Sequence, residues 1–184
     1  MPATGPDGPD LAANLPPGFR LREAHLDDAI AARNLVFDVL QEFGLRPDPE
    51  GADRDLIEFE AHYGSGGGWF CVLTDSEGAV VGTVALREVT SGVVELRKMY
   101  LRSKHRGLGL GRALLETALD EAKRRGYRKV RLETATVLRE AVRMYEGRGF
   151  RDATEVARAC RCDRVMELEI GLGATAQVNG RGGQ

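Results

Sequence analysis

The sequence predicts an α/β protein of the α+β type, with a mixed but mostly antiparallel sheet of six to seven strands flanked by about four helices. Three short runs rich in valine, threonine and aromatic residues follow one another across turn sequences, at 69–74, 79–87 and 93–101. Such runs are typical of antiparallel strands. The third run is followed by a strong helical pattern (109–125) and another strand-like run (129–134). This crossover joins parallel neighbours, so only the central pair of strands is expected to be parallel.

The first part of the chain is expected to form one strand and two helices. Apolar and charged residues alternate over 19–23, as in a half-buried strand. Apolar residues then recur at helical spacing from a polar start at 25–28 until Gly44 ends the run. Two prolines make 46–51 a loop, because each restricts itself and its predecessor. A second helical pattern covers 53–63.

The last part of the chain contains the clearest helix. Over 109–125 the apolar residues form one row and the polar residues another, and Gly126 ends the helix. Val130 and Leu132 are expected to face inward from the strand that follows. A further helix over 138–147 and two final strands, at about 150–158 and 162–170, complete the predicted elements.

One domain is expected between two tails. A chain of 184 residues fits a single domain. Five prolines lie among the glycines and aspartates of 1–18, and 171–184 is rich in glycine, so neither segment can bury much apolar surface. The domain is therefore expected to cover 19–170.

The overall charge and hydropathy exclude several partners. The 28 acidic residues nearly balance the 26 basic ones, which leaves no broad basic face for nucleic acid. No apolar stretch approaches the length of a membrane span, and the first residues lack the pattern of a secretory signal. We therefore expect a cytoplasmic protein without a nucleic-acid or membrane partner.

The three cysteines are expected to be reduced and packed. Cys71, Cys160 and Cys162 are too few for a disulfide framework. If Cys160 and Cys162 lay in a strand, both thiols would be on one face and could share a metal ion. Four ligands are usual, and no second pair follows them. No metal site is predicted.

A glycine-rich loop between a strand and a helix carries the strongest functional signal. Gly107, Gly109 and Gly111 let backbone N–H groups approach an anion without obstruction by side chains. The start of the helix adds about half a positive charge, and Arg106 and Arg112 add full ones. This arrangement predicts a phosphate or pyrophosphate site.

Two other phosphate-binding motifs fit this loop less well. A Walker loop needs Gly-Lys-Ser/Thr, and here Arg112 and Ala113 follow the last glycine. A dinucleotide fingerprint would need glycine at position 112 or 114, where Arg112 and Leu114 stand. Glu133 lies at a distance along the chain that suits a ribose contact, so a nucleotide-binding domain of another kind stays an alternative.

The loop resembles the signature of the GNAT superfamily of acetyl-CoA-dependent N-acetyltransferases. That signature is Arg or Gln, two residues, Gly, one residue, and Gly or Ala, and it matches Arg106, Gly109 and Gly111. The resemblance extends over the neighbouring strands and helices and covers about 19–170. It implies acetyl-CoA as co-substrate and a strand before the loop that splays from its parallel neighbour. The implied coenzyme contacts are Met99, Leu101, Arg106, Gly107, Leu108, Gly109, Leu110, Gly111 and Arg112.

The resemblance also implies two catalytic residues. Tyr145 matches the tyrosine that donates a proton to the departing thiolate, although it could be a half-buried core phenol. Glu95 stands where some members carry the base, although it could instead pair with Arg97. Glu133 or a water molecule is the reserve candidate. A base is useful because an amine with a pKa near 10.4 is almost fully protonated at pH 7.

Two positions depart from the family pattern. Leu138 replaces an asparagine that often contacts the coenzyme, and Ser103 replaces a common proline. The first departure removes one polar contact, and neither removes the pyrophosphate site.

Members of the superfamily usually build the acceptor pocket from the first two helices and their loop, here 37–63. This segment is acidic, which suits a cationic amine, although a solvated helix face would look the same. Tyr63 and Trp69 could form an aromatic wall or belong to the core. The acidic segment contains Asp48, Glu50, Asp53, Asp55, Glu58, Glu60 and His62.

The sequence therefore predicts transfer of an acetyl group from acetyl-CoA to a primary amine, most simply that of a small molecule, by direct attack. A backbone amide near Met99 would polarise the thioester carbonyl. One alternative is a protein N-terminal or lysine acetyltransferase. Another is a non-catalytic acyl-CoA-binding or sensor module. A homodimer is compatible with each of them.

Overall fold

The computed structural model describes residues 11, 15–65, 67–155, 157 and 159–171. They form a seven-stranded sheet in the order β1-β2-β3-β4-β5-β7-β6. All neighbours are antiparallel except β4 and β5. The predicted fold class is therefore confirmed, together with its single parallel pair. The strands are β1 (Arg20–Glu23), β2 (Trp69–Thr74), β3 (Val80–Thr90), β4 (Val93–Leu101), β5 (Lys129–Thr134), β6 (Arg151–Asp152) and β7 (Arg164–Glu169).

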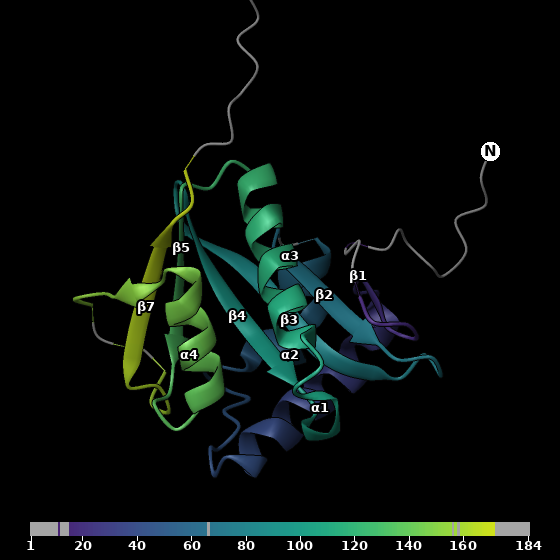
Figure 1. Cartoon of the computed structure of the whole chain (residues 1–184). Helices are drawn as coiled ribbons and strands as arrows, with labels where there is room; N and C mark the ends of the chain where they lie inside the picture. Colours follow the sequence, from purple (N-terminus) through teal and green to yellow (C-terminus); the bar gives the residue numbers. More distant parts are fainter. Residues whose placement is uncertain (1–10, 12–14, 66, 156, 158, 172–184) are drawn as a thin grey trace, which may run out of the picture.

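Helices cover both faces of the sheet, as Figure 1 shows. The first two helices lie on one face, and the last two lie on the other. Short helical turns join them to the strands. The helices are α1 (Ala29–Glu42), α2 (Arg54–Ile57), α3 (Leu110–Arg124) and α4 (Arg139–Arg148), and the turns are η1 (Leu26–Asp28), η2 (Glu60–Gly64) and η3 (Ser103–His105).

The core has two parts, one on each side of the sheet. On the α3 side, the predicted apolar row of that helix is fully buried, and Val130 and Leu132 of β5 face it, as predicted. Burial of a leucine side chain contributes roughly 1.5–3 kcal/mol, so α3 is firmly fixed to the sheet. The buried row contains Leu110, Leu114, Ala118 and Ala122. On the other side, α1 packs over β3 and β4.

The helix predicted over 53–63 is wrong in one respect, because it is divided. Helix α2 ends at Ile57, and the chain then forms the π-helical turn η2. Asp53 and Asp55 both contact the ammonium group of Lys98. Residues two apart on a helix do not face the same side, so one regular helix could not direct both carboxylates there. Helix α2 instead begins after Asp53.

The strand predicted over about 150–158 is also much shorter. Strand β6 contains only Arg151 and Asp152, and a loop then leads to β7. Within this loop Glu155 pairs with Arg131 of β5, a contact that the loop makes after leaving the sheet edge. Cys160 lies in a turn of this loop and is exposed. The prediction that Cys160 is a packed thiol is therefore wrong.

Part of the predicted N-terminal tail contacts the domain. The backbone N–H of Leu11 donates to the carbonyl of Leu21 at 2.7 Å, and Leu15 packs against the core. Most of both predicted tails, 1–10, 12–14 and 172–184, lies outside the described residues. Among the helices that the structure describes, none combines the length and apolar character needed to cross a bilayer.

Candidate active site

The parallel strands β4 and β5 separate halfway along β4. Their pairing runs from Val93 opposite Lys129 to Leu96 opposite Leu132. Strand β4 continues to Leu101 without β5 beside it. The resemblance implied this splay. It opens the sheet between the two strands (Figure 1).

A bulge in β4 lies at this opening. Ala85 of β3 is opposite Arg97 and Thr83 is opposite Tyr100, so β4 has one residue more than β3 between these pairs. Lys98 takes a φ of 49°, which costs a non-glycine residue about 1–2 kcal/mol. The Thr83 hydroxyl donates to the Lys98 carbonyl at 2.6 Å and helps to hold this conformation. The bulge brings the consecutive residues Arg97 and Lys98 to the wall of the same cavity.

A cavity of about 600 Å³, here called the glycine-loop cavity, lies beside the start of α3. Its walls come from the end of β4, the glycine-rich loop, the start of α4 and the last turns of α1. The lining residues are Val39, Phe43, Met99, Tyr100, Leu101, Arg106, Gly107, Gly109, Gly111, Arg112, Leu114, Val137, Leu138, Arg139, Glu140, Ala141 and Met144.

The glycine-rich loop offers unpaired backbone N–H groups to this cavity. Gly107 and Gly109 both have a φ of +79°, a conformation that glycine adopts readily. In the described part of the chain, no backbone hydrogen bond starts from the N–H groups of 107–112. Helix α3 begins at Leu110, so these groups coincide with its positive end. The loop has the donors that a phosphate needs, and its role in binding one stays a prediction.

Two of the predicted coenzyme contacts, Leu108 and Leu110, do not line this cavity, and a third, Arg106, is engaged in an ion pair. The side chain of Leu108 is exposed, and that of Leu110 is buried in the core, so neither lines the cavity. The Arg106 guanidinium donates to both carboxylate oxygens of Glu42, at 2.6 and 3.0 Å, and to the carbonyl of Leu101. The positive charge of Arg106 is therefore shared with α1. Arg106 still lines the cavity, together with the other predicted contacts Met99, Leu101, Gly107, Gly109, Gly111 and Arg112.

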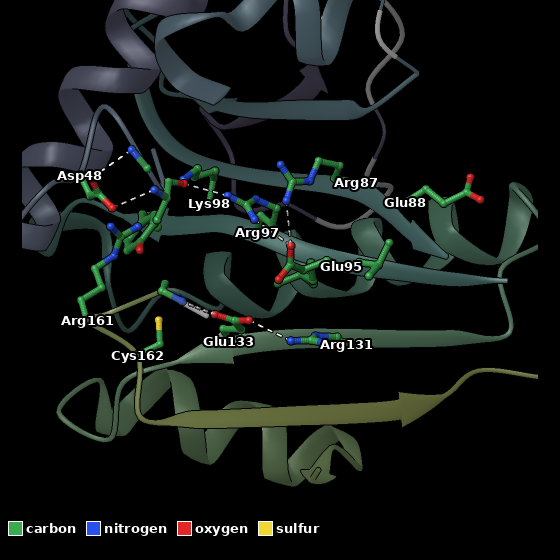
Figure 2. A pocket seen from close by; sticks show the side chains of 16 residues that line it. Asp48, Arg87, Glu88, Glu95, Arg97, Lys98, Arg131, Glu133, Arg161 and Cys162 are labelled. Carbon is green, nitrogen blue, oxygen red and sulfur yellow. Dashed lines mark hydrogen bonds and ion pairs between the residues drawn. The ribbon is translucent and has the colours of Figure 1, made fainter. Parts of the chain in front are cut away.

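A second cavity of about 520 Å³, here called the charged cavity, lies over β3, β4 and β5 (Figure 2). The loop before β7 and the loop before α2 complete it. Tyr100 lines both cavities, so they adjoin at the opening between β4 and β5. The charged cavity is lined by Asp48, Gly51, Ala52, Arg87, Glu88, Val89, Glu95, Leu96, Arg97, Lys98, Tyr100, Arg131, Glu133, Ala159, Arg161 and Cys162.

Two buried aspartates neutralise the cations at the back of the charged cavity. Lys98 Nζ lies 2.5 Å from Asp53 and 3.2 Å from Asp55. Arg161 donates to both oxygens of Asp53, and Arg97 donates to Asp55. Burial alone would raise the pKa of both aspartates, but the neighbouring cations outweigh it and hold each pKa below its usual value. Burial lowers the pKa of Lys98 despite the two carboxylates.

Most of the acidic residues predicted for the acceptor pocket do not line the charged cavity. Of the seven residues named from the sequence, only Asp48 lines the charged cavity. Its carboxylate accepts the backbone N–H groups of Gly51 and Ala52, so it shapes the loop. Asp53 and Asp55 lie behind the lining, and the others lie outside it. Tyr63 and Trp69 belong to the core.

Both predicted bases line the charged cavity. The Glu95 carboxylate is 2.7 Å from Arg97 and 3.6 Å from Arg87, all through its Oε2 atom. Glu133 accepts Arg131 at 2.8 Å on one oxygen and the backbone N–H of Ala159 at 3.0 Å on the other. The sequence-based alternative, an ion pair of Glu95 with Arg97, is therefore present. It leaves the Oε1 atom of Glu95 without a hydrogen bond from the described residues.

The predicted acid, Tyr145, lies behind the wall of the glycine-loop cavity. It is buried, and its hydroxyl lies 3.7 Å from the sulfur of Met99, which lines that cavity. Burial raises the pKa of Tyr145 far above its ordinary value. Burial also raises the pKa of Tyr100 to about 12, and Asp53 adds to the effect. The sequence did not single out Tyr100, although it is the phenol shared by both cavities.

The arginines and the thiol of the charged cavity were also missed. Arg87, Arg131, Arg161 and Cys162 line it. Burial raises the pKa of the Cys162 thiol to about 11. One signal was present in the sequence, because Arg131 and Glu133 stand two apart in a strand and so share a face. Arg161 carried no such signal, since its partner is 108 residues away. No group of three metal-ligating side chains occurs among the described residues.

Comparison with known proteins adds independent information. Residues 33–150 match the family model described as "Acetyltransferase (GNAT) family". An uncharacterized N-acetyltransferase of Escherichia coli (strain K12) is 34% identical over 155 residues, which are 82% of this chain and 90% of that protein. An uncharacterized N-acetyltransferase of Schizosaccharomyces pombe is 33% identical over 118 residues, covering 64% of this chain and 72% of the relative.

Solved structures share the fold. An acetyltransferase of the GNAT family from Staphylococcus aureus Mu50 superposes with a TM-score of 0.76 at 20% identity, over 83% of this chain and 99% of that one. A putative acetyltransferase from Salmonella typhimurium, solved with acetyl-CoA, superposes with a TM-score of 0.66 at 22% identity, over 88% of this chain and 99% of that one. At these identities the likeness concerns the fold alone.

Proposed function

This chain belongs to the acetyltransferase (GNAT) family, and from that premise we propose that it transfers the acetyl group of acetyl-CoA to the primary amine of a small molecule. One observation carries the proposal. Two cavities adjoin at the opening between β4 and β5, and Tyr100 lines both. One presents backbone N–H groups at the positive end of α3, and the other presents ionisable side chains. Such a pair of sites suits a coenzyme on one side and an acceptor on the other.

The glycine-loop cavity would hold the coenzyme. The N–H groups around Gly109 and Gly111, with Arg112, would bind the pyrophosphate. The main-chain groups of Met99 and Leu101, on the part of β4 that β5 leaves, would bind the pantetheine arm. The neighbour from Salmonella typhimurium was solved with acetyl-CoA, which supports this choice of coenzyme. Bound there, acetyl-CoA supplies the thioester that the amine attacks.

Glu95 is the base that this proposal favours. The ammonium form of an amine must lose a proton before it can attack. The Oε1 atom of Glu95 accepts no hydrogen bond from the described residues, so it can take that proton directly or through water. Glu133 is the weaker candidate, because each of its two oxygens already accepts a hydrogen bond. A backbone amide near Met99 would polarise the thioester carbonyl.

Tyr145 is the proposed acid for the departing thiolate. Its raised pKa keeps the phenol protonated at neutral pH, and it contacts Met99 in the wall of the coenzyme cavity. Tyr100 is the rival, because it is also protonated at neutral pH and lines both cavities. Replacing each by phenylalanine separates them, since only the acid should lower kcat while acetyl-CoA affinity is kept.

The proposal is tested by incubating the full chain with acetyl-CoA and a panel of primary amines. Mass spectrometry of the amines should show an added acetyl group, with one free CoA thiol per product. Glu95→Gln should lower kcat/KM by about 10²-fold or more near neutral pH, as expected for loss of a general base. Glu77→Gln, in an exposed turn, is the matched control.

Other outcomes would point elsewhere. Acetyl-CoA binding without product from any amine or peptide would favour a sensor module and contradict the proposal. Acetylation of peptide N-termini or lysines, with none of the small amines modified, would leave the chemistry intact and overturn the small-molecule acceptor.

A further inference from the structure

Three neighbouring strands place Arg87, Glu95 and Arg131 in one row across the charged cavity. Arg87 of β3 is opposite Glu95 of β4, and Glu95 is opposite Arg131 of β5. Residues directly opposite one another in a sheet point to the same face. All three line the cavity, and Figure 2 shows Glu95 between the two arginines. A carboxylate therefore stands between two guanidinium groups.

Arg87 differs from the other cations of this cavity because it is only weakly paired. Lys98 and Arg161 are held by buried aspartates at 2.5–2.7 Å. Arg87 makes no hydrogen bond within the described residues, and its Nη2 atom is 3.6 Å from the Glu95 carboxylate, beyond hydrogen-bond distance. Its side chain is 41% exposed. Its donors remain free to receive an anion from the cavity.

Arg131 also has a donor to spare. Its side chain is only 8% exposed and pairs with Glu133 and Glu155. Its Nε atom is buried and has no acceptor among the described residues. Buried donors in folded proteins nearly always have a partner, so an unmet one at the wall of a cavity is notable. A ligand anion beside Arg131 would accept a hydrogen bond from the Nε side of the guanidinium.

We propose that the acceptor is an amine that also carries an anionic group, with a carboxylate as the simplest case, and that Arg87 and Arg131 bind the anion. The inference rests on the proposed function and specifies its substrate class. Glu95 stands in the same row as the two arginines, so it would take the proton of the amine through water. A neutral or purely cationic amine would leave the donors of Arg87 and the Nε atom of Arg131 without an acceptor among the described residues.

The length of the acceptor follows from the strand. Met99 is four positions beyond Glu95, and the bulge in β4 adds one residue without lengthening the strand. At about 3.3 Å for each of the remaining three positions, the row of arginines lies about 10 Å from the Met99 amide. The amine must reach the opening at Met99 while the anion stays at the row. A chain of several carbon atoms between amine and carboxylate spans this distance better than the single carbon of an α-amino acid.

The test uses binding, so that it does not depend on turnover. The full chain is loaded with CoA and titrated calorimetrically with 6-aminohexanoate. Two compounds serve as comparisons: 6-aminohexan-1-ol, which has a hydroxyl group in place of the carboxylate, and glycine, which has one carbon between amine and carboxylate. The carboxylate should bind at least tenfold more tightly than the alcohol and than glycine, as expected for a hydrogen bond to a charged group. Arg87→Gln should remove most of this preference without changing the affinity for CoA.

Controls keep the result interpretable. Arg46→Gln replaces an exposed arginine outside both cavities and should leave the preference intact. Arg131 is buried, so Arg131→Lys, which keeps the charge but loses the Nε donor, is compared only after its unfolding temperature is measured. Equal affinity for acid and alcohol, no binding of the carboxylate, or a preference that survives Arg87→Gln would overturn the proposal.

The two proposals can fail separately. If CoA-loaded protein binds 6-aminohexanoate through Arg87 but no amine is ever acetylated, the anion site stands and the transfer reaction does not. If neutral amines are acetylated as efficiently as the matched amino acids, the transfer reaction stands and the anion site does not.

Discussion

Gly111 is the position where the stability of the fold and the affinity for coenzyme should respond in opposite directions. It is the second residue of α3 and lines the glycine-loop cavity. Its φ is not positive, and an added Cβ would meet only the Met144 sulfur, at an ordinary contact distance of 3.7 Å. A short side chain therefore fits there without strain. The informative pair of substitutions is Gly111→Asp and Gly111→Asn, which differ in charge and hardly in shape.

The expected magnitudes follow from the helix terminus. Replacing a helical glycine gains a few tenths of a kcal/mol, and an acid in the first turn gains about 0.3–1 more, so Gly111→Asp should raise the free energy of unfolding by about 1 kcal/mol. That corresponds to an increase in Tm of about 2–4 °C. The same charge beside a pyrophosphate costs about 4 kcal/mol for one charge pair at 4 Å and an effective dielectric constant of 20. Acetyl-CoA should then bind about 10³-fold more weakly.

Two measurements on each variant check this reasoning. Thermal unfolding without ligand gives the change in Tm, and calorimetric titration with acetyl-CoA gives the affinity. Gly111→Asn should keep most of the affinity, because it adds no charge. If Gly111→Asp binds acetyl-CoA as tightly as Gly111→Asn does, the pyrophosphate does not lie at the start of α3. If it instead lowers the Tm, the stabilising effect expected at the helix terminus is absent.

Three further predictions concern the two cavities. Tyr145→Phe should lower kcat by about 10²-fold while KM for acetyl-CoA stays unchanged, and an unchanged kcat in steady-state kinetics would remove Tyr145 as the acid. The folded pKa of Asp53 lies below the ordinary 3.8, so its stabilisation is present above that pH and is lost as the pH falls through the folded pKa. Urea unfolding from about pH 3 to 7 should show that Asp53→Asn lowers the free energy of unfolding by about 3 kcal/mol at neutral pH. The free energy of unfolding of this variant should also fall less steeply toward low pH, and an unchanged fall would contradict the assignment. Glu42→Gln frees Arg106 from a partly exposed ion pair, so the free energy of unfolding should fall by less than about 1 kcal/mol. Calorimetry should show an unchanged or higher affinity for acetyl-CoA. Weaker binding would contradict this and would mean that the ion pair holds the loop in its binding conformation.

The elements that the sequence predicted correctly are those whose signal is local. Strands β2, β3 and β4 follow from valine-rich runs separated by turns, and α3 follows from its apolar row. The helix predicted over 53–63 failed because its shape depends on Lys98, which lies on a distant strand. Helix propensity and hydrophobic pattern are local properties of the sequence, so they do not predict such a tertiary contact.

The same distinction applies to the candidate site. The glycine-rich loop is a contiguous segment, so its own residues were enough to place it at the start of a helix. The charged cavity is built from three strands and two loops, and its bridge from Asp53 to Arg161 joins residues 108 positions apart. The acidic residues near Asp53 therefore looked like a pocket for a cation. In the fold Asp53 and Asp55 are neutralised by arginines and a lysine that no local pattern places beside them.

The central claim is that the glycine-loop cavity binds the coenzyme, and a calorimetric titration of the full chain with acetyl-CoA, CoA, NAD and ATP tests it most directly. We predict micromolar binding of acetyl-CoA and CoA and no comparable binding of NAD or ATP. Binding of NAD or ATP without binding of CoA would contradict the assignment of the glycine-loop cavity, and with it the proposed reaction.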